Sequence, residues 1–209
     1  MLRIGFFQKV ASRIAATFLI AVVLVCTGTS QPARAGADPV LSIPDYVHLS
    51  HYTVSGFSSA EIVEHIASSG PVDLSGNRRA ALTKWSFTPQ WHRLPNGLIE
   101  PSRSSITPAY TIVLPKWQAG PGSLAEPPDF WSAYFDAIVI HELNHLSNAQ
   151  SCVQRLENLL RNWHSPLGAE EKIILHEFRK ILLQCSRKDI AYDRATRNGE
   201  LEGVVLHRR

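Results

Sequence analysis

The residues best suited to chemistry are His141, Glu142 and His145, which form an HExxH motif. Histidines four residues apart lie one turn above each other on a helix, so both imidazoles can bind the same metal ion. Zinc lowers the pKa of a coordinated water toward neutrality, and a neighbouring carboxylate can take its proton during attack on a peptide carbonyl. The motif predicts Zn²⁺ held by His141 and His145, with Glu142 as the general base.

The surroundings of the motif favour a buried metal site. Neither of the two variable positions is charged, and a solvated helix face would carry Lys or Glu there. The alternative is a pair of histidines whose polar atoms are satisfied inside an ordinary core. The flanking side chains are apolar: Ile138, Val139, Ile140, Leu143 and Leu146.

Residues 1–35 have the features of a secretory signal peptide. Three basic residues precede an apolar run over 14–26, and Ala33-Arg34-Ala35 is an A-x-A cleavage site. The run is too short for a comfortable membrane span. We expect an exported protein, periplasmic or secreted, that contacts the membrane only through this segment if it stays uncleaved.

Removal of the leader changes the charge of the chain. The leader contains four basic residues and no acidic one, so the remainder has 17 basic and 18 acidic residues. No basic field remains to attract nucleic acid, and no basic cluster is interleaved with aromatic side chains. Nucleic-acid binding is therefore excluded as the main function. The sequence does not indicate an oligomeric state.

Cys152 and Cys185 are the two cysteines downstream of the leader. An exported protein enters an oxidising compartment, and two cysteines allow a single intramolecular pairing. The sequence favours a disulfide between them, and the alternative is two buried thiols that act as small apolar side chains.

The order of the expected elements indicates an α+β, zincin-like fold in one domain over residues 46–209, after a flexible lead-in over 36–45. Strands are expected over 46–54, 84–91 and 109–114, and Pro89 favours an edge position for the second of them. Ser59 is a candidate cap for a short helix over 60–69. Long helices are expected over 130–162, with Asp129 as N-cap, and over 169–197. The strand over 109–114 is our candidate for an exposed edge that pairs with substrate backbone, with an ordinary core strand as the alternative.

Several segments together resemble a bacterial family of predicted secreted zinc-dependent proteases, catalogued as a domain of unknown function. They are His51–Gly56, Thr83–Phe87, Leu114–Trp117, Trp131, the HExxH motif and Ala191–Gly199. In the last segment the family pattern usually has a histidine where this chain has Asn198. If that histidine is a metal ligand of the family, the resemblance implies that this chain has lost a ligand.

A catalytic zinc site normally has three protein ligands, so one more is needed. Glu177 is a candidate because many enzymes with an HExxH motif use a glutamate on a following helix as the third ligand. The alternative for His176 and Glu177 is a solvated helix face. The downstream candidates are His164, His176, Glu177, Asp189, Asp193, Asn198 and His207.

The cysteines give a geometric test of these candidates. If they are bonded between antiparallel helices, seven residues back from Cys152 is His145, and seven residues forward from Cys185 is Tyr192. Both steps are about 10 Å, which places Asp193 level with His145 and Glu177 about 22 Å away. We therefore expect Asp193 as third ligand, with Asp189 next. Tyr192 is a candidate donor to the developing oxyanion, or else a core tyrosine.

These observations predict an exported zinc peptidase that acts on peptide or protein substrates. The alternative is a non-catalytic envelope module of the same fold that binds peptide or cell-wall components, and Asn198 is the feature that separates the two. Hydrolysis of another amide, such as a peptidoglycan cross-link, would use the same residues.

Overall fold

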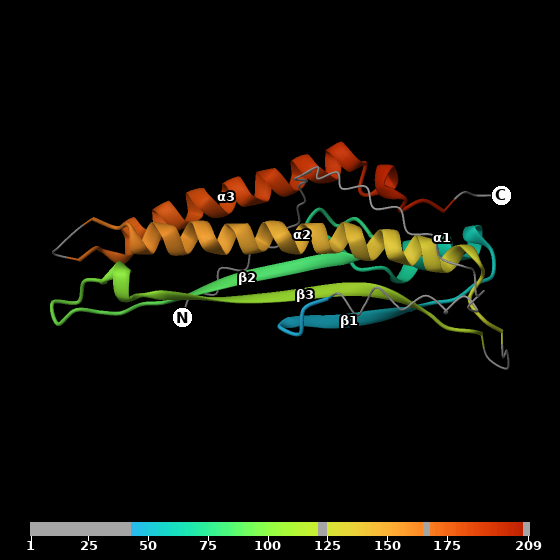
Figure 1. The fold of residues 1–209 in the computed structure, drawn as a ribbon, viewed down its shortest axis with the longest axis horizontal. Coiled ribbons are helices and arrows are strands. Elements are labelled where there is room, and N and C mark those ends of the chain that lie inside the picture. Colours follow the sequence, from blue (N-terminus) through green and yellow to red (C-terminus); the bar gives the residue numbers. More distant parts are fainter. Residues whose placement is uncertain (1–42, 121–124, 165–167, 207–209) are drawn as a thin grey trace, which may run out of the picture.

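The computed structural model describes residues 43–120, 125–164 and 168–206, and the leader lies outside them. In the described part of the chain, a three-stranded sheet is followed by two long helices that lie on one side of it (Figure 1). The α+β prediction, with the HExxH helix packed against a C-terminal helix, is confirmed.

The sheet consists of β1 (Val47–Val54), β2 (Leu82–Gln90) and β3 (Ser105–Trp117) in the order β1-β3-β2. β3 is parallel to β1 and antiparallel to β2. Pro89 was expected on an edge strand, and β2 is one. Of the two alternatives for residues 109–114, the edge strand is wrong and the core strand is confirmed, because they belong to the central strand, which has a partner on each side. An extended substrate cannot pair there.

Two boundaries differ from the sequence prediction for local reasons. β3 continues through Pro115, which was expected to end it. Pairing with β2 stops at Val113, so beyond that residue β3 is paired with β1 alone, and a proline without an N–H is tolerated there. Helix α1 (Ser59–Ser69) is capped by Ser58 and not by Ser59. The Ser58 hydroxyl accepts the Glu61 N–H and the Glu61 carboxylate accepts the Ser58 N–H, a capping box whose spacing selects Ser58.

The two long helices agree closely with their predicted ranges. α2 is Phe130–Arg161 and α3 is Glu171–Thr196. Asp129 occupies the N-cap position of α2 without a side-chain hydrogen bond. After α3 the chain turns through Arg197 and Asn198, both with left-handed backbone, and a short 3₁₀ turn, η3 (Glu200–Glu202), follows.

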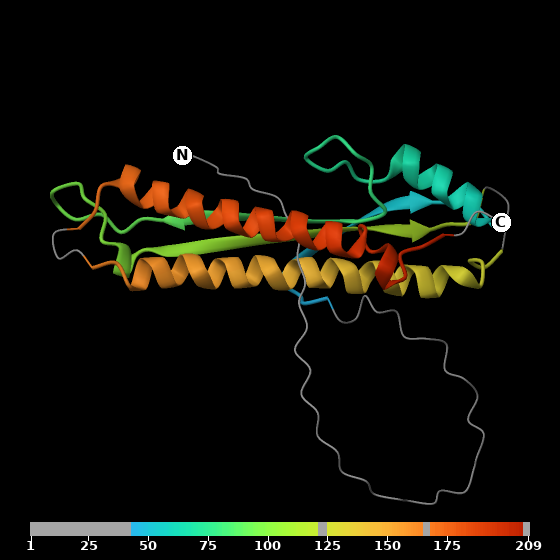
Figure 2. The same cartoon turned by 90° about the horizontal axis from the view of Figure 1, so that it is seen from above.

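α2 packs on β2 and β3, and α3 packs on α2 while running in the opposite direction (Figures 1 and 2). Trp85, Ile112 and Leu114 of the sheet and Ile138 and Leu156 of α2 are fully buried between the layers. The core therefore holds one face of α2 against the sheet, and α3 covers a second face of α2.

Cys152 of α2 and Cys185 of α3 form a disulfide with Cα atoms 6.1 Å apart, so this prediction is confirmed. A structural disulfide is consistent with an extracytoplasmic protein. Within the described ranges, none of the helices combines the length and the apolar character that a membrane span requires.

Replacing both cysteines, Cys152→Ala with Cys185→Ala, should lower the free energy of unfolding by about 3–4 kcal/mol. The physical reason is that the bond restricts the unfolded chain by closing a loop over a sequence separation of 33 residues. Urea unfolding of metal-free protein, followed by circular dichroism, measures the change. The parent protein treated with a reductant is the control and should lose the same amount. An unchanged midpoint in both samples would contradict a stabilising bond.

Candidate metal centre

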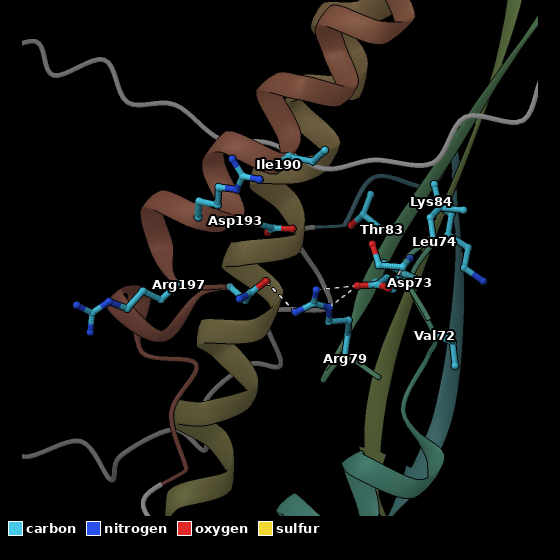
Figure 3. A pocket seen from close by; sticks show the side chains of 13 residues that line it. Val72, Asp73, Leu74, Arg79, Thr83, Lys84, Ile190, Asp193 and Arg197 are labelled. Carbon is cyan, nitrogen blue, oxygen red and sulfur yellow. Dashed lines mark hydrogen bonds and ion pairs between the residues drawn. The ribbon is translucent and has the colours of Figure 1, made fainter. Parts of the chain in front are cut away.

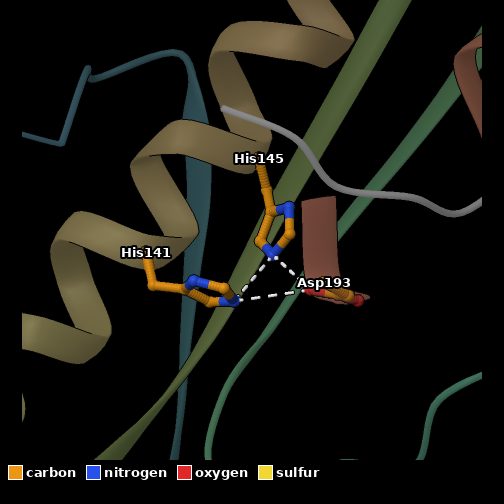
Figure 4. Close-up of side chains that lie close together, drawn as sticks. All are labelled: His141, His145 and Asp193. Atoms are coloured by element: carbon orange, nitrogen blue, oxygen red, sulfur yellow. Dashed lines mark hydrogen bonds and ion pairs between the residues drawn. The ribbon is translucent and has the colours of Figure 1, made fainter. Parts of the chain in front are cut away.

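His141 and His145 lie one turn apart on α2 and are 3% and 0% exposed. Their helix face is covered by the sheet and by α3, which explains why polar side chains at these positions are buried. The two Nε2 atoms are 3.0 Å apart and face a common point (Figure 4). The expected juxtaposition of the two imidazoles is therefore present.

The third member of the group is Asp193 of α3. Its Oδ1 atom lies 3.5 Å from Nε2 of His141 and 3.3 Å from Nε2 of His145 (Figure 4). Four ligands at zinc–ligand distances of about 2.0–2.1 Å in a tetrahedron are separated from each other by about 3.3 Å. The three edges observed here match that value, so the donor set fits a zinc ion.

The other candidates for third ligand lie elsewhere. Glu177 is a surface residue that forms an ion pair with Lys180 at 2.7 Å. Asn198 points its amide oxygen at Arg79, whose Nη1 donates to it at 2.8 Å. Of the described acidic and histidine side chains, only Asp193 joins the two histidines in a group able to hold a metal. His207 lies outside the described residues.

The outer nitrogen of His141 contacts a residue that the sequence did not suggest. Nδ1 lies 2.7 Å from Oε2 of Glu202, which belongs to η3. Because Nε2 faces Asp193, the Nδ1–H donates to this carboxylate. Such an interaction fixes the tautomer of a metal-binding histidine and increases its basicity.

Tyr192 lies on the same side of His141 as Glu202. Its ring stacks on the imidazole with centroids 5.1 Å apart, and its hydroxyl donates to Glu202 at 2.5 Å. Burial, reinforced by this hydrogen bond, raises the pKa of the hydroxyl well above its ordinary value. The hydroxyl is directed to the Nδ1 side of His141, away from the Nε2 triangle. This geometry favours a role in holding Glu202 and His141 over the predicted donation to an oxyanion.

Asp189 lies next to Nδ1 of His145, the ring nitrogen that faces away from the triangle. It is fully buried, and its Oδ1 atom lies 3.9 Å from Nδ1 of His145. Asn148 of α2 donates to the same oxygen at 3.3 Å. Each histidine therefore has a carboxylate next to its Nδ1 atom, on the side away from the triangle. For His145 this carboxylate is Asp189, which is not one of the three residues of the triangle.

Glu142 is 2% exposed, and its carboxylate is held by the edge strand. The Thr83 hydroxyl of β2 donates to Oε2 of Glu142 at 2.6 Å and lies 3.1 Å from its carbonyl oxygen. A carboxylate that accepts a hydrogen bond in a buried place has a fixed orientation. In the sequence, the signal for Thr83 is its position at the start of Thr83–Phe87, a segment that resembles the family.

Two cavities adjoin the triangle. The large cavity, of about 670 Å³, is lined by Asp193, Thr83 and residues of the loop before β2. The small cavity, of about 270 Å³, is lined by His141, Glu142 and residues in and around η3. Both are bounded by Arg79, Arg197 and Asn198. The candidate centre is thus reached from two sides, with Arg79 between them.

Arg79 is held in place from two directions (Figure 3). Its guanidinium pairs with the Asp73 carboxylate at 2.7 Å and donates to Asn198 at 2.8 Å. Asp73 also accepts the N–H groups of Ser75 and Asn77. Burial acts to raise the pKa of Asp73, but the hydrogen bonds and the Arg79 charge outweigh it, so the pKa is lowered. Arg79 therefore joins the loop before β2 to the end of α3.

Comparison with known families gives a match to the model of DUF922, described as a bacterial protein of unknown function, over residues 49–200. The chain belongs to this family. Searches of the curated proteins and of the solved structures found no match. The matched range covers β1 through the start of η3, and so it includes both histidines and Asp193. Glu202 lies two residues beyond it.

In this DUF922 chain, Asp193→Ala should weaken zinc binding by about a hundredfold or more, because it removes a charged oxygen donor from the triangle. Asn198→His should change the dissociation constant little, since position 198 faces Arg79. Competition with a chromophoric zinc chelator measures both. The opposite pattern, with tighter binding by Asn198→His and no loss in Asp193→Ala, would place the third ligand at position 198.

Glu202→Gln should weaken zinc binding by about 10- to 100-fold, the usual effect of losing a carboxylate that orients a metal-binding histidine. Glu200→Gln is the matched control on the same turn, because the Glu200 side chain is exposed. The same chelator competition applies. Equal dissociation constants for Glu202→Gln and Glu200→Gln would remove Glu202 from the centre.

Proposed function

We propose that this protein is an exported zinc-dependent peptidase that cleaves peptide bonds with a metal-activated water. The observation on which the proposal rests is the buried triangle of His141, His145 and Asp193 with the Glu142 carboxylate on the adjacent residue. This combination of a metal-binding group and a buried carboxylate is what amide hydrolysis at neutral pH requires.

The charge around the triangle supports a divalent cation. Glu142, Asp189, Asp193 and Glu202 place four carboxylates around two imidazoles. The negative charge of four carboxylates makes this place electrostatically favourable for a divalent cation. A bound zinc ion would offset this charge and lower the pKa of a coordinated water to near neutrality.

The protein's own groups then have distinct tasks. His141, His145 and Asp193 would hold the ion, with Glu202 and Asp189 orienting the imidazoles from outside. Glu142 would accept the proton of the attacking water and later deliver it to the leaving amine. Thr83 keeps the Glu142 carboxylate in one orientation, and in this scheme it is a positioning residue.

The edge of β2 offers a place for an extended substrate. Phe87 is paired with Pro108, and Pro89 with Ile106. Proline has no N–H to donate, which favours the non-hydrogen-bonded kind of pair at both positions. By alternation, we then expect the backbone groups of Phe87, Trp85 and Thr83 to point away from β3. The large cavity borders this edge at Leu82–Lys84. We therefore propose that an extended substrate pairs with β2 and not with residues 109–114.

A non-catalytic binding module of the same fold was the alternative suggested by Asn198. That alternative assumed that position 198 should supply a metal ligand. Asp193 lies in the triangle instead, and Asn198 is engaged with Arg79. This arrangement favours the catalytic proposal, with peptide cross-links of the cell wall among the substrates to be tested.

Glu142→Gln should abolish hydrolysis while leaving the zinc content near one ion per chain, because an amide cannot accept the proton of the water. Cleavage of unfolded proteins and peptidoglycan peptides is followed by mass spectrometry, and zinc by elemental analysis. Glu177→Gln is the control for a surface glutamate and should retain activity. His141→Ala should lose both the metal and the activity.

Equal cleavage by Glu142→Gln and the parent protein would overturn the proposal. A parent protein that binds zinc tightly but cleaves nothing on the panel would favour the non-catalytic module.

A further inference from the structure

We infer that the large cavity binds a large apolar side chain of the substrate, next to the bond cleaved at the metal centre. This inference rests on the proposed function, because only that function places a cleaved bond at the metal centre. It names the class of peptide that the chain selects: one with a leucine-, isoleucine- or phenylalanine-like residue and without a basic residue at that position.

Part of the cavity wall is formed by exposed apolar side chains. Leu74 is 71% exposed, Val72 46% and Ile190 40%, and all three line the cavity. They come from two separate parts of the chain, the loop before β2 and helix α3, which face each other across the opening (Figure 3). Apolar side chains that gather from different elements around one opening mark a binding site, whereas isolated ones do not.

The cavity is continuous with the candidate metal centre. Ile190 precedes Asp193 by three residues on α3, so the two side chains lie on one face about one turn, or about 5 Å, apart. On the opposite wall, Leu82 is adjacent to Thr83, whose hydroxyl holds Glu142. A side chain bound between Leu74 and Ile190 would therefore belong to a residue close to the cleaved bond.

The size of the cavity and its charge narrow the choice of side chain. A volume of about 670 Å³ is within the range of pockets that enclose small ligands, so a leucine or phenylalanine side chain fits. The lining also contains Arg194 and Arg197, while Asp73 is paired with Arg79 and Asp193 belongs to the triangle. A lysine or arginine side chain would meet like charge there and is disfavoured.

The first experiment maps cleavage sites. The zinc-loaded mature protein digests a library of peptides derived from a bacterial proteome, and the products are sequenced by mass spectrometry. We expect large apolar residues at one position flanking the cleaved bond and a depletion of Lys and Arg there. Leu74→Asp and Ile190→Asp should each reduce kcat/KM for such peptides by about tenfold or more, with unchanged zinc content.

Leu183→Asp is the matched control. Leu183 is 47% exposed and lies seven residues before Ile190 on α3, so it occupies the same stripe of the helix outside the cavity lining described above. This variant should cleave like the parent protein. Cleavage without any preference at the flanking positions, or equal losses in Leu183→Asp and Ile190→Asp, would overturn the inference.

The second experiment does not depend on turnover. Zinc-loaded Glu142→Gln is titrated with the blocked peptides acetyl-Ala-Leu-Ala-amide, acetyl-Ala-Gly-Ala-amide and acetyl-Ala-Lys-Ala-amide, and binding is followed by NMR. The leucine peptide should bind about tenfold tighter than the other two, and Ile190→Asp introduced into the Glu142→Gln protein should remove the difference. Equal affinities would overturn the inference. If the parent protein cleaves nothing but this selectivity holds, the proposed hydrolysis fails and the apolar site stands.

Discussion

The antiparallel register of α2 and α3 is the constraint on which the candidate centre depends. Successive contacts follow the two helices in opposite directions, one turn at a time: Cys152 with Cys185, Asn148 with Asp189, and Asn144 with Tyr192. Asp193, the residue after Tyr192, lies within this register and approaches His141 and His145. A shift by one turn, about 5 Å, would break every one of these contacts. The covalent bond therefore fixes the position of the third member of the triangle.

The sheet provides the other half of the centre. β2 lies under α2, and its Thr83 hydroxyl reaches Glu142, while the loop that precedes it carries Asp73 and Arg79 toward the end of α3. The edge strand is thus connected to the general-base candidate and to the rim of both cavities. Binding of a peptide along β2 would place its backbone beside Thr83, which orients the Glu142 carboxylate.

Local patterns were enough for most of the fold. The two long helices, the short capped helix and the alternation of Trp85 and Phe87 each depend on residues close together in the chain, and they were predicted to within a few residues. The Cys152–Cys185 pairing also followed, since only one pairing was available, and with helix geometry it placed Asp193. The sequence could not decide between an edge strand and a core strand for residues 109–114, because the two can share one sequence pattern and differ only in how many neighbouring strands they acquire.

The HExxH motif and the helix that carries it could be predicted from the sequence, because spacing along a helix determines which side chains share a face. The partners of those side chains could not. Thr83 and Glu202 lie 59 and 61 residues from the groups that they contact, and no periodicity connects them. Short-range pattern therefore determined which two histidines share a helix face and could hold a metal. Only tertiary packing decided which carboxylates surround it, which strand edge stays open and where the cavities lie, because each depends on contacts between segments far apart in the chain.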